Sequence, residues 1–476
     1  MQKYGCWRLN RKDQNNMSLR VTFAILMCKI TRFFLRVLRR GGTSLPGKIA
    51  EDICPALLKH LAKDVKCIAV TGTNGKTTSA RMLEQLFIDS GAGFLSNKSG
   101  SNLMRGITTD FALNSTFSGK PKRQYAIVEC DEAASKKVFE YLNPKVVLVT
   151  NVFNDQLDRF GSVEAILENI KQGVKNSPNA VVCLNADDPL TSSIADGISN
   201  KVVFFGLGQG VFDNNVSASS GARRCVRCNT QYEYNYRTYE HLGDFRCPSC
   251  GHARTSPDVT VTELIGADED SQTVNLLAFG ETSEVTINIP GEYNMYNAAG
   301  VVAAAQILGF SPDAVRYALQ HFERGFGRME KLELDGLSVR LILVKNTAGC
   351  NQALNYITTL TSDIILAFCL NDRVSDGADV SWINDVCFEK LTDIGGRLRG
   401  VLVSGTRADD MSRRLEAAGI PPELMRVNKD PCDMLSAALD AAHEQDAAVC
   451  ILPTYSAMLE LRAMICRRFG LKNYWE

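Results

Sequence analysis

The chain is 476 residues long, which exceeds the size of one ordinary hydrophobic core and predicts two or three domains. Its 53 Lys and Arg residues balance its 53 Asp and Glu residues, and this neutral charge argues against a nucleic-acid coat or a polybasic partner surface. Sixteen cysteines lie mostly in apolar runs and we find no cleavable signal, so we expect a protein of the reducing cytoplasm.

Residues 1–45 form a basic amphipathic segment. The first 40 residues contain ten Lys or Arg residues against a single acid, and cationic and apolar side chains interleave over residues 19–40. The longest uncharged run in that stretch, Val21 to Cys28, is too short to span a bilayer. Two alternatives stay open: the helix packs on the body of the protein, or it lies on an anionic membrane surface. Packing is favoured, because an apolar stripe usually faces a core.

A glycine loop follows the first buried strand. Residues 67–70 are typical of that strand, residues 71–78 read Thr-Gly-Thr-Asn-Gly-Lys-Thr-Thr, and apolar residues then recur at helical spacing. Strand, loop and helix in this order predict a phosphate-binding loop for ATP or GTP. Lys76 would neutralise the outer phosphates, and the Thr77 hydroxyl would ligate Mg²⁺. The loop departs from the strict motif at Val70, where a glycine is expected.

Four further apolar runs with helical stretches between them predict a mostly parallel sheet: 125–128, 146–149, 180–184 and 202–205. The first two runs end in polar side chains, at the edge where an open α/β sheet places its ligand crevice. These side chains are Glu129, Asp131, Thr150, Asn151, Asp155 and Asp158. A carboxylate at that edge can hold Mg²⁺. Helix N-capping is an equal alternative for Asp131 and Glu132, but less so for Glu129, which directly follows its strand.

Two Cys-x-x-Cys pairs interrupt the pattern within residues 222–254. Eighteen residues separate the pairs, which is the spacing of a four-thiolate zinc ribbon. Four sulfurs leave no open coordination position, so the zinc would be structural. The candidate ligands are Cys225, Cys228, Cys247 and Cys250. Disulfides are the competing interpretation. The tyrosines between the pairs either cover the ribbon's hydrophobic face or stack on nucleic-acid bases.

Further motifs make a family resemblance specific. Residues 291–299 read Gly-x-x-Asn-x-x-Asn-Ala-Ala, residues 185–189 read Asn-Ala-Asp-Asp-Pro, and residues 326–330 read Phe-Gly-Arg-Met-Glu. Together with the phosphate loop and Glu129, this order of motifs resembles the ATP-dependent Mur ligase family over about residues 60–330. The resemblance implies an α/β protein: a Mur ligase-like central P-loop ATPase domain and a smaller C-terminal domain.

The implied domain boundaries follow from these motifs. Residues 1–45 precede the central ATP-binding domain, which covers 46–330 and contains the inserted zinc ribbon. A smaller Rossmann-like α/β domain covers 331–476. The ribbon and the C-terminal motifs narrow the resemblance to family members that amidate lipid II in peptidoglycan biosynthesis. These motifs are Lys345-Asn346-Thr347-Ala348-Gly349, Asn371-Asp372, Asp376-Gly377 and Asp379-Val380-Ser381-Trp382-Ile383.

That resemblance implies a reaction and a partner. ATP would phosphorylate the α-carboxylate of D-glutamate in the lipid II stem peptide, and ammonia would displace the phosphate to give D-isoglutamine. A separate GatD-type glutamine amidotransferase subunit would supply the ammonia. The location would be the cytoplasm, at the inner face of the plasma membrane if residues 19–40 contact lipid.

The resemblance also implies roles for single residues. The nucleotide would be bound by Thr73, Asn74, Gly75, Lys76, Thr77, Thr78, Asn297 and Arg328. Asn297 would serve the adenine, Arg328 would reach across the domain boundary, and Thr77 and Glu129 would serve Mg²⁺. Asp379 would be catalytic, orienting or deprotonating ammonium, although a helix N-cap is its structural alternative.

Two departures and two rival functions complete the prediction. Gln156 stands where amino-acid-adding Mur ligases have histidine, and Thr347 stands where proline is common. A ligase that joins an amino acid to a carboxylate would share the same ATP site. A zinc-ribbon P-loop protein that binds nucleic acid is the rival from another class, and salt-sensitive oligonucleotide binding would favour it.

Overall fold

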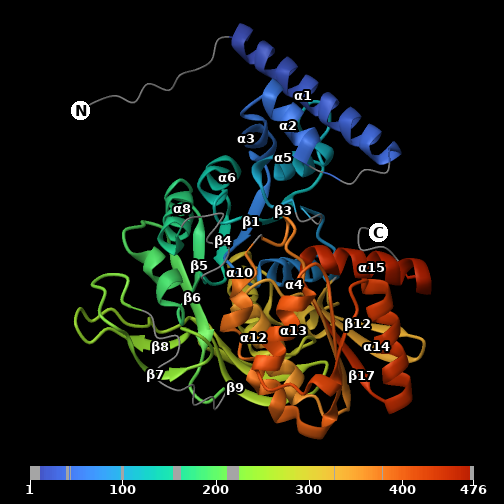
Figure 1. The fold of residues 1–476 in the computed structure, drawn as a ribbon. Helices are drawn as coiled ribbons and strands as arrows, with labels where there is room; N and C mark the ends of the chain where they lie inside the picture. Colours follow the sequence, from blue (N-terminus) through green and yellow to red (C-terminus); the bar gives the residue numbers. More distant parts are fainter. Residues whose placement is uncertain are drawn as a thin grey trace.

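The computed structural model describes residues 11–38, 42, 44–97, 101–153, 162–211, 224–325, 327–377 and 379–471. Two β-sheets with helices on their faces form the body of the protein, and a long helix lies at one end (Figure 1). The N-terminal helix α1 lies at the top of the drawn view, and the C-terminal helix α15 lies lower, beside α14 (Figure 1).

The first sheet has nine strands in the order β11-β10-β9-β6-β5-β4-β1-β3-β2. From β2 to β9 all neighbouring strands are parallel, whereas β9, β10 and β11 pair antiparallel. The strands are β1 (Lys66–Thr71), β2 (Phe94–Ser96), β3 (Tyr125–Glu129), β4 (Val146–Val149), β5 (Val181–Asn185), β6 (Val202–Leu207), β9 (Val259–Ala267), β10 (Gln272–Ala278) and β11 (Glu281–Ile287). All four strands predicted after the phosphate loop are present.

Helices cover both faces of this sheet. On β1, Ile68 and Val70 belong to one buried cluster, and Cys67 and Ala69 belong to another, as the alternation of a strand with two covered faces requires. One face carries α4 (Lys76–Asp89), α10 (Glu292–Ile307) and α11 (Pro312–Gln320). The other carries α3 (Leu57–Ala62), α5 (Met104–Leu113), α6 (Ser135–Leu142), α8 (Val163–Lys175) and the short α9 (Pro189–Ser192) and η1 (Ser193–Ala195).

The second sheet has six strands in the order β12-β13-β17-β14-β15-β16. Only β12 is antiparallel to its neighbour. The strands are β12 (Arg328–Leu334), β13 (Leu337–Ile342), β14 (Ile364–Cys369), β15 (Leu398–Ser404), β16 (Met425–Val427) and β17 (Ala448–Pro453). The helices are α12 (Thr347–Thr359), α13 (Ala408–Ala417), α14 (Pro431–Gln445), α15 (Tyr455–Phe469), η2 (Ser381–Asp385), η3 (Phe388–Arg397) and η4 (Pro422–Leu424).

A small insertion separates β6 from β9. Its two antiparallel strands, β7 (Glu233–Arg237) and β8 (Gly243–Arg246), form a sheet of their own. Turns carrying the two Cys-x-x-Cys pairs flank this hairpin. The hairpin lies at the edge of the molecule in Figure 1, beside β6 and β9.

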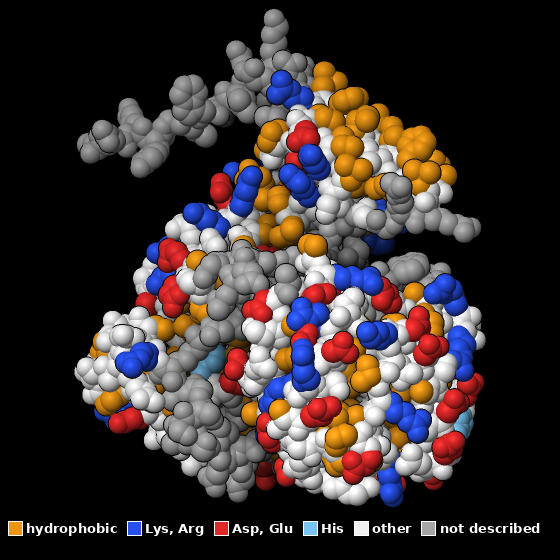
Figure 2. Space-filling model, viewed as in Figure 1, with side chains coloured by type: hydrophobic (Ala, Val, Ile, Leu, Met, Phe, Trp, Pro, Cys, Tyr) orange, Lys and Arg blue, Asp and Glu red, His pale blue; other side chains and the backbone are white. Residues whose placement is uncertain are grey.

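The N-terminal helices α1 (Arg11–Val37) and α2 (Ser44–Ile53) pack beside α3 and α5. One face of α1 is buried in this contact through Val21, Ala24, Ile25 and Cys28, so the helix packs on the body as the sequence favoured. The opposite face of α1 is exposed and apolar (Figure 2). Within the described residues, no helix has the length and apolar content required to cross a membrane.

Candidate active site

Two glycines shape the loop between β1 and α4. Gly72 and Gly75 have φ angles of 122° and 86°, which residues with a side chain rarely adopt. Close contacts exclude a side chain as well: a Cβ at Gly72 would lie 2.3 Å from Thr150 Oγ1, and a Cβ at Gly75 would lie 2.1 Å from Asn297 Oδ1. The strand, loop and helix therefore lie in the predicted order, with α10 packed directly against the loop.

The residues after β4 support the loop. The backbone carbonyl of Asn151 accepts a hydrogen bond from Thr73 N at 2.8 Å, and its side-chain oxygen accepts one from Asn74 N at 2.9 Å. The Thr150 hydroxyl donates to the Asn74 carbonyl at 2.6 Å. Thr150 and Asn151, which the sequence placed at the ligand crevice, thus fix the backbone of the phosphate loop.

Lys76 lies buried beside the loop and pairs with Glu132. Its Nζ donates to the Glu132 carboxylate at 2.7 Å and to the carbonyls of Gly72 and Thr73. Burial by itself would lower the pKa of Lys76, but the carboxylates of Glu132 and Glu129 outweigh burial and raise the pKa. Lys76 is therefore held as a cation. The N-cap alternative for Glu132 is not what the structure shows, because α6 has no side-chain cap.

A cavity of about 640 Å³ lies between the phosphate loop and the second sheet. The first sheet contributes the loop and three carboxylates that follow β3, Glu129, Asp131 and Glu132. The second sheet contributes Arg328, Leu343, Lys345, Ser375, Asp376, Thr454 and Tyr455. The cavity therefore brings together seven of the predicted nucleotide and magnesium residues: Thr73, Asn74, Gly75, Lys76, Thr77, Glu129 and Arg328.

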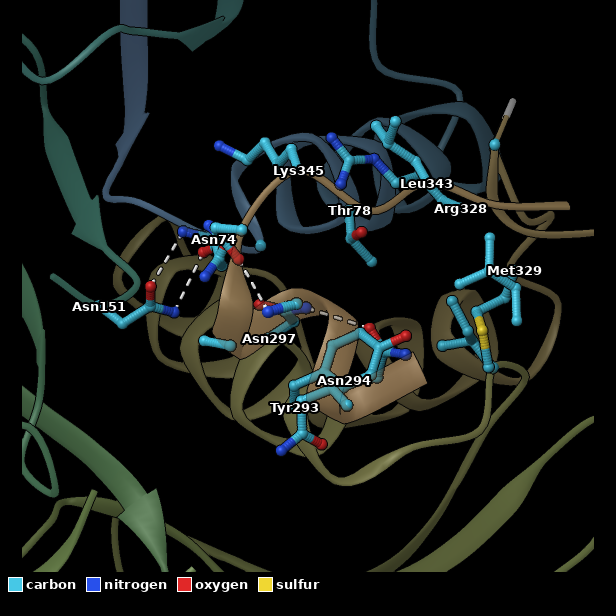
Figure 3. A pocket seen from close by; sticks show the side chains of 18 of the residues that line it. Asn74, Thr78, Asn151, Tyr293, Asn294, Asn297, Arg328, Met329, Leu343 and Lys345 are labelled. Atoms are coloured by element: carbon cyan, nitrogen blue, oxygen red, sulfur yellow. Dashed lines mark hydrogen bonds between the residues drawn. The ribbon is translucent and has the colours of Figure 1, made fainter. Parts of the chain in front are cut away.

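A smaller cavity of about 70 Å³ is lined by some of the same residues and reaches α10 (Figure 3). Figure 3 shows Arg328 and Lys345 on one side, with Asn294 and Asn297 of α10 on the other. Asn297 donates to Asn294 Oδ1 at 3.1 Å and is nearly fully buried. Thr78 also lines this cavity, so the structure brings Asn297 and Thr78 to the predicted nucleotide region.

Arg328, the first residue of β12, crosses from the second sheet to the phosphate loop. Its Nη2 donates to Thr77 Oγ1 at 3.3 Å. Burial lowers the pKa of Arg328, and the nearby Glu129 carboxylate opposes this shift. The geometry joins Arg328, Thr77 and Glu129, which the sequence analysis had assigned to nucleotide and magnesium.

The sequence analysis assigned no role to Lys345 and Asn346, which follow β13. Lys345 lines both cavities, and its Nζ lies 3.5 Å from the Thr73 carbonyl. Asn346 caps α12 by accepting from Gly349 N at 2.8 Å, and its Nδ2 donates to Asn74 Oδ1 at 3.2 Å. A cation directly after a buried strand, at the edge where sheets bind ligands, was the available signal.

Asp379 lies outside both cavities. Its carboxylate accepts hydrogen bonds from Ser381 N at 2.7 Å and from the Ser381 hydroxyl at 2.9 Å, and these bonds lower its pKa. Asp376, three residues earlier, is buried, lines the larger cavity and accepts from Ser456 N at 2.7 Å. The catalytic role of Asp379 stays a prediction. Asp155, Gln156, Asp158 and Phe326 lie outside the described residues.

The four cysteines of the insertion converge. Their sulfurs all lie within 4.8 Å of one another, with 3.5 Å between Cys225 and Cys250 and 3.4 Å between Cys228 and Cys247. None of the described cysteines forms a disulfide. Four soft sulfur donors in this arrangement fit a tetrahedral Zn²⁺.

The insertion is hydrogen-bonded to the helix that lines the smaller cavity. The Thr238 and Tyr296 hydroxyls are 2.8 Å apart, and Tyr296 donates to Asp187 at 2.7 Å. Arg254 of the insertion pairs with the same Asp187 at 2.6 Å. Tyr239 itself lines the smaller cavity. The cysteine insertion thus forms part of the wall of the candidate site.

Two sheets that meet over a phosphate loop define the Mur ligase fold. The family model of the Mur ligase middle domain matches residues 70–305 of this chain, and the family model of the MurT ligase C-terminal domain matches residues 343–458. Among solved structures, MurF from Acinetobacter baumannii superposes with a TM-score of 0.64 at 18% identity, covering 89% of this chain and 81% of that one. Folylpolyglutamate synthase from Mycobacterium tuberculosis, solved with ADP, gives 0.61 at 16% identity, covering 94% and 99%.

Comparison of sequences shows which Mur ligases this chain resembles over nearly its whole length. The MurT subunit of lipid II isoglutaminyl synthase (glutamine-hydrolyzing) from Streptococcus pneumoniae is 32% identical over 95% of this chain and 98% of its own. The subunit of the same name from Staphylococcus aureus is 28% identical over 94% and 98%. The chain belongs to the MurT family of Mur ligases.

Proposed function

We propose that this chain is the ligase subunit of a lipid II isoglutaminyl synthase, which uses ATP to amidate the α-carboxylate of D-glutamate in the lipid II stem peptide. The observation that carries the proposal is the larger cavity, which places Lys76 and Glu129 of the first sheet opposite Arg328 and Lys345 of the second. Similarity over nearly the whole chain to subunits of that name supports the substrate class.

A carboxylate is a poor electrophile, so the reaction needs an activated intermediate. The D-glutamate carboxylate attacks the γ-phosphorus of ATP, ADP leaves, and an acyl phosphate forms. Ammonia then attacks the acyl carbon, inorganic phosphate leaves, and the nitrogen loses a proton. Lys76 and Arg328 would stabilise the charge on the phosphoryl group during transfer.

The oxygen donors Thr77 and Glu129 line one cavity and fit a hard cation. Bound Mg²⁺ would neutralise phosphate charge there. We assign the backbone of Thr73 to Thr78 to the phosphates and Asn297 to the adenine; the smaller cavity beside Asn297, at about 70 Å³, would have to widen to admit the base. Its lining by Tyr239, Tyr293 and the amides of α10 offers both an apolar face and hydrogen-bond partners for a base.

We propose that ammonia comes from a GatD-type glutamine amidotransferase bound as a second subunit, because the relatives are named as subunits of a glutamine-hydrolyzing enzyme. We assign the complex to the cytoplasm, where ATP is available and thiols stay reduced. The proposal includes no role for nucleic acid.

Asp379 would orient or deprotonate the incoming ammonium. Its carboxylate, whose pKa is lowered by hydrogen bonds from Ser381, is ionised at neutral pH as an ordinary aspartate is. Asp379→Asn should lower kcat with ammonium by about 100-fold at an unchanged melting temperature. The matched control is Asp385→Asn, an exposed aspartate six residues away, which should retain activity. Near-normal turnover by the folded Asp379→Asn protein would remove this residue from the mechanism.

Zn²⁺ bound by the four cysteines would hold the insertion together. Cys247→Ser should therefore abolish stoichiometric zinc binding and lower the melting temperature, both measured on purified protein. Cys387→Ser changes an exposed cysteine outside the cluster and should do neither. Zinc content that is zero in the wild-type protein would contradict the assignment.

The main test supplies purified protein with lipid II, ATP and ammonium, and measures the product mass. The proposal predicts conversion of one acid to an amide with release of ADP. A product that incorporates an added amino acid, but not ammonia, would support the rival ligase. Unchanged lipid II, in a preparation that binds ATP, would contradict the proposed function.

A further inference from the structure

Helix α1 has two apolar faces, and only one is covered. The inner face packs on α2, α3 and α5. The outer face forms a stripe along the helix, and its large side chains are between 37% and 69% exposed (Figure 2). This outer stripe consists of Leu19, Phe23, Leu26, Ile30, Phe33, Phe34 and Val37, continued by Leu38. Exposed apolar surface of this extent marks an interaction site.

The part of the chain that carries the outer stripe is basic. Between Gln14 and Ala50 the chain has no acidic residue, and its seven cations are Arg20, Lys29, Arg32, Arg36, Arg39, Arg40 and Lys48. At 3.6 residues per turn, Arg20 lies on one flank of the stripe, and Lys29 and Arg36 lie on the other. Arg20 and Arg36 are exposed, so their charges can reach a surface that the stripe contacts.

We propose that the outer stripe of α1 docks on an anionic lipid surface, with the helix parallel to the membrane plane. An apolar face bordered by cations on both flanks matches the boundary between acyl chains and anionic headgroups. An anionic lipid surface supplies the negative charge that is absent from the chain between Gln14 and Ala50.

The position of α1 fits the reaction, and this step rests on the proposed function. Helix α5 contacts α1, and the two residues just before α5, Asn102 and Leu103, line the larger cavity. A single helix therefore connects the membrane-facing stripe to the cavity. Docking would keep the cavity close to the headgroup of a lipid-linked stem peptide while the helix remains outside the bilayer core.

Vesicle flotation of the full chain tests the proposal. The probes are vesicles of phosphatidylcholine, with or without phosphatidylglycerol. The wild-type protein should float with the anionic vesicles and lose binding as salt rises. Phe23→Ser/Phe33→Ser should weaken binding at least about tenfold, because two aromatic side chains no longer enter the interface. Arg20→Gln/Arg36→Gln should weaken it about fivefold per charge.

Val374→Ser is the matched control, since Val374 is 89% exposed on the second sheet's side of the molecule and should not affect flotation. Melting temperature and ATP binding should be unchanged in every variant. Wild-type protein that stays unbound, or a Phe23→Ser/Phe33→Ser protein that floats equally well, would overturn the proposal. Sedimentation without lipid that shows a dimer in the wild type and a monomer in this variant would instead identify a second copy as the occupant.

Amidation of a soluble stem-peptide substrate separates this proposal from the proposed function. The docking variants should retain that activity, because none of their residues lines either cavity. Docking without amidation would contradict the proposed reaction alone, and amidation without docking would contradict only the membrane surface.

Discussion

The two sheets meet in two places that differ in how firmly they are joined. Away from the cavity, Asp270 in the β9–β10 turn pairs with Arg324, Lys331 and Arg340, each at 3.0 Å. At the cavity, Arg328 reaches Thr77 at 3.3 Å. Lys345 and Asn346 also contact the loop there, at 3.5 Å and 3.2 Å. Ion pairs therefore hold the two sheets together at Asp270. At the cavity, where substrates would enter, the sheets are joined by longer polar contacts.

The phosphate loop is also held in place firmly, as the sheets are at Asp270. Thr73, Asn74 and Lys76 are fixed by bonds of 2.7–2.9 Å to Asn151 and Glu132. One wall of the cavity is therefore preformed, whereas the other is positioned from a distant part of the chain. Backbone donors that are already held in place act without reorganisation when a phosphate binds.

The largest effect on kcat is expected from a change in the preformed wall of the cavity, which contains Lys76. Lys76→Met removes the cation from the phosphates and should lower kcat by at least about 10³-fold, measured as ADP release. The change also leaves Glu132 buried without its cation, so Lys76→Met/Glu132→Gln is the matched control for folding. Activity that returned in the double variant would show that the lysine acts only on Glu132.

An intermediate effect is expected where the second wall meets the loop. Arg328→Lys keeps the charge but loses the planar guanidinium that donates to Thr77, and it should lower kcat/KM for ATP about tenfold. Most of the loss should appear in KM if Arg328 positions the nucleotide. A wild-type kcat/KM would remove Arg328 from the nucleotide site.

The smallest effect on catalysis is expected at Asp270, where ion pairs hold the two sheets together. Burial works against the ionised form of Asp270, but hydrogen bonds from Lys331 and Arg340 lower its pKa well below the usual range. A lowered folded-state pKa stabilises the protein above the unfolded pKa of about 4, and this contribution is lost as the pH falls through the folded-state value.

Asp270→Asn should therefore lower the melting temperature by a few degrees at neutral pH, with kcat nearly unchanged. The difference from the wild type should shrink as the pH falls below about 4, where the carboxylate begins to be protonated in the unfolded chain. Calorimetry over a pH series measures this. A difference that stays constant down to acid pH would show that charge is not what joins the sheets there.

Local sequence predicted the preformed wall well. The phosphate loop, its flanking strand and helix, and the paired cysteines are each specified by neighbouring residues, so spacing alone identified them. Arg328 and Asn297 were found through their motifs. The two alternatives for residues 19–40 were less opposed than the sequence indicated, because one face of α1 packs and the other is exposed.

Contacts between residues far apart in the chain could not be predicted from the sequence. The pairing of Lys76 with Glu132 links residues 56 positions apart, and nothing in the local pattern distinguishes Glu132 from an N-cap. The roles of Lys345 and Asp376 in the cavity depend on how the second sheet is placed. Tyr239 reaches the smaller cavity only because the cysteine insertion folds back on α10. The domain boundaries near residues 45 and 330 stay predictions.

The central claim is that ATP activates the carboxylate as an acyl phosphate. The most direct measurement uses a stem peptide in which both oxygens of the D-glutamate α-carboxylate are oxygen-18, with ATP and ammonium. The account predicts one labelled oxygen in each inorganic phosphate released, since the attacking carboxylate oxygen leaves with the phosphoryl group. Amide formed with unlabelled phosphate would contradict it.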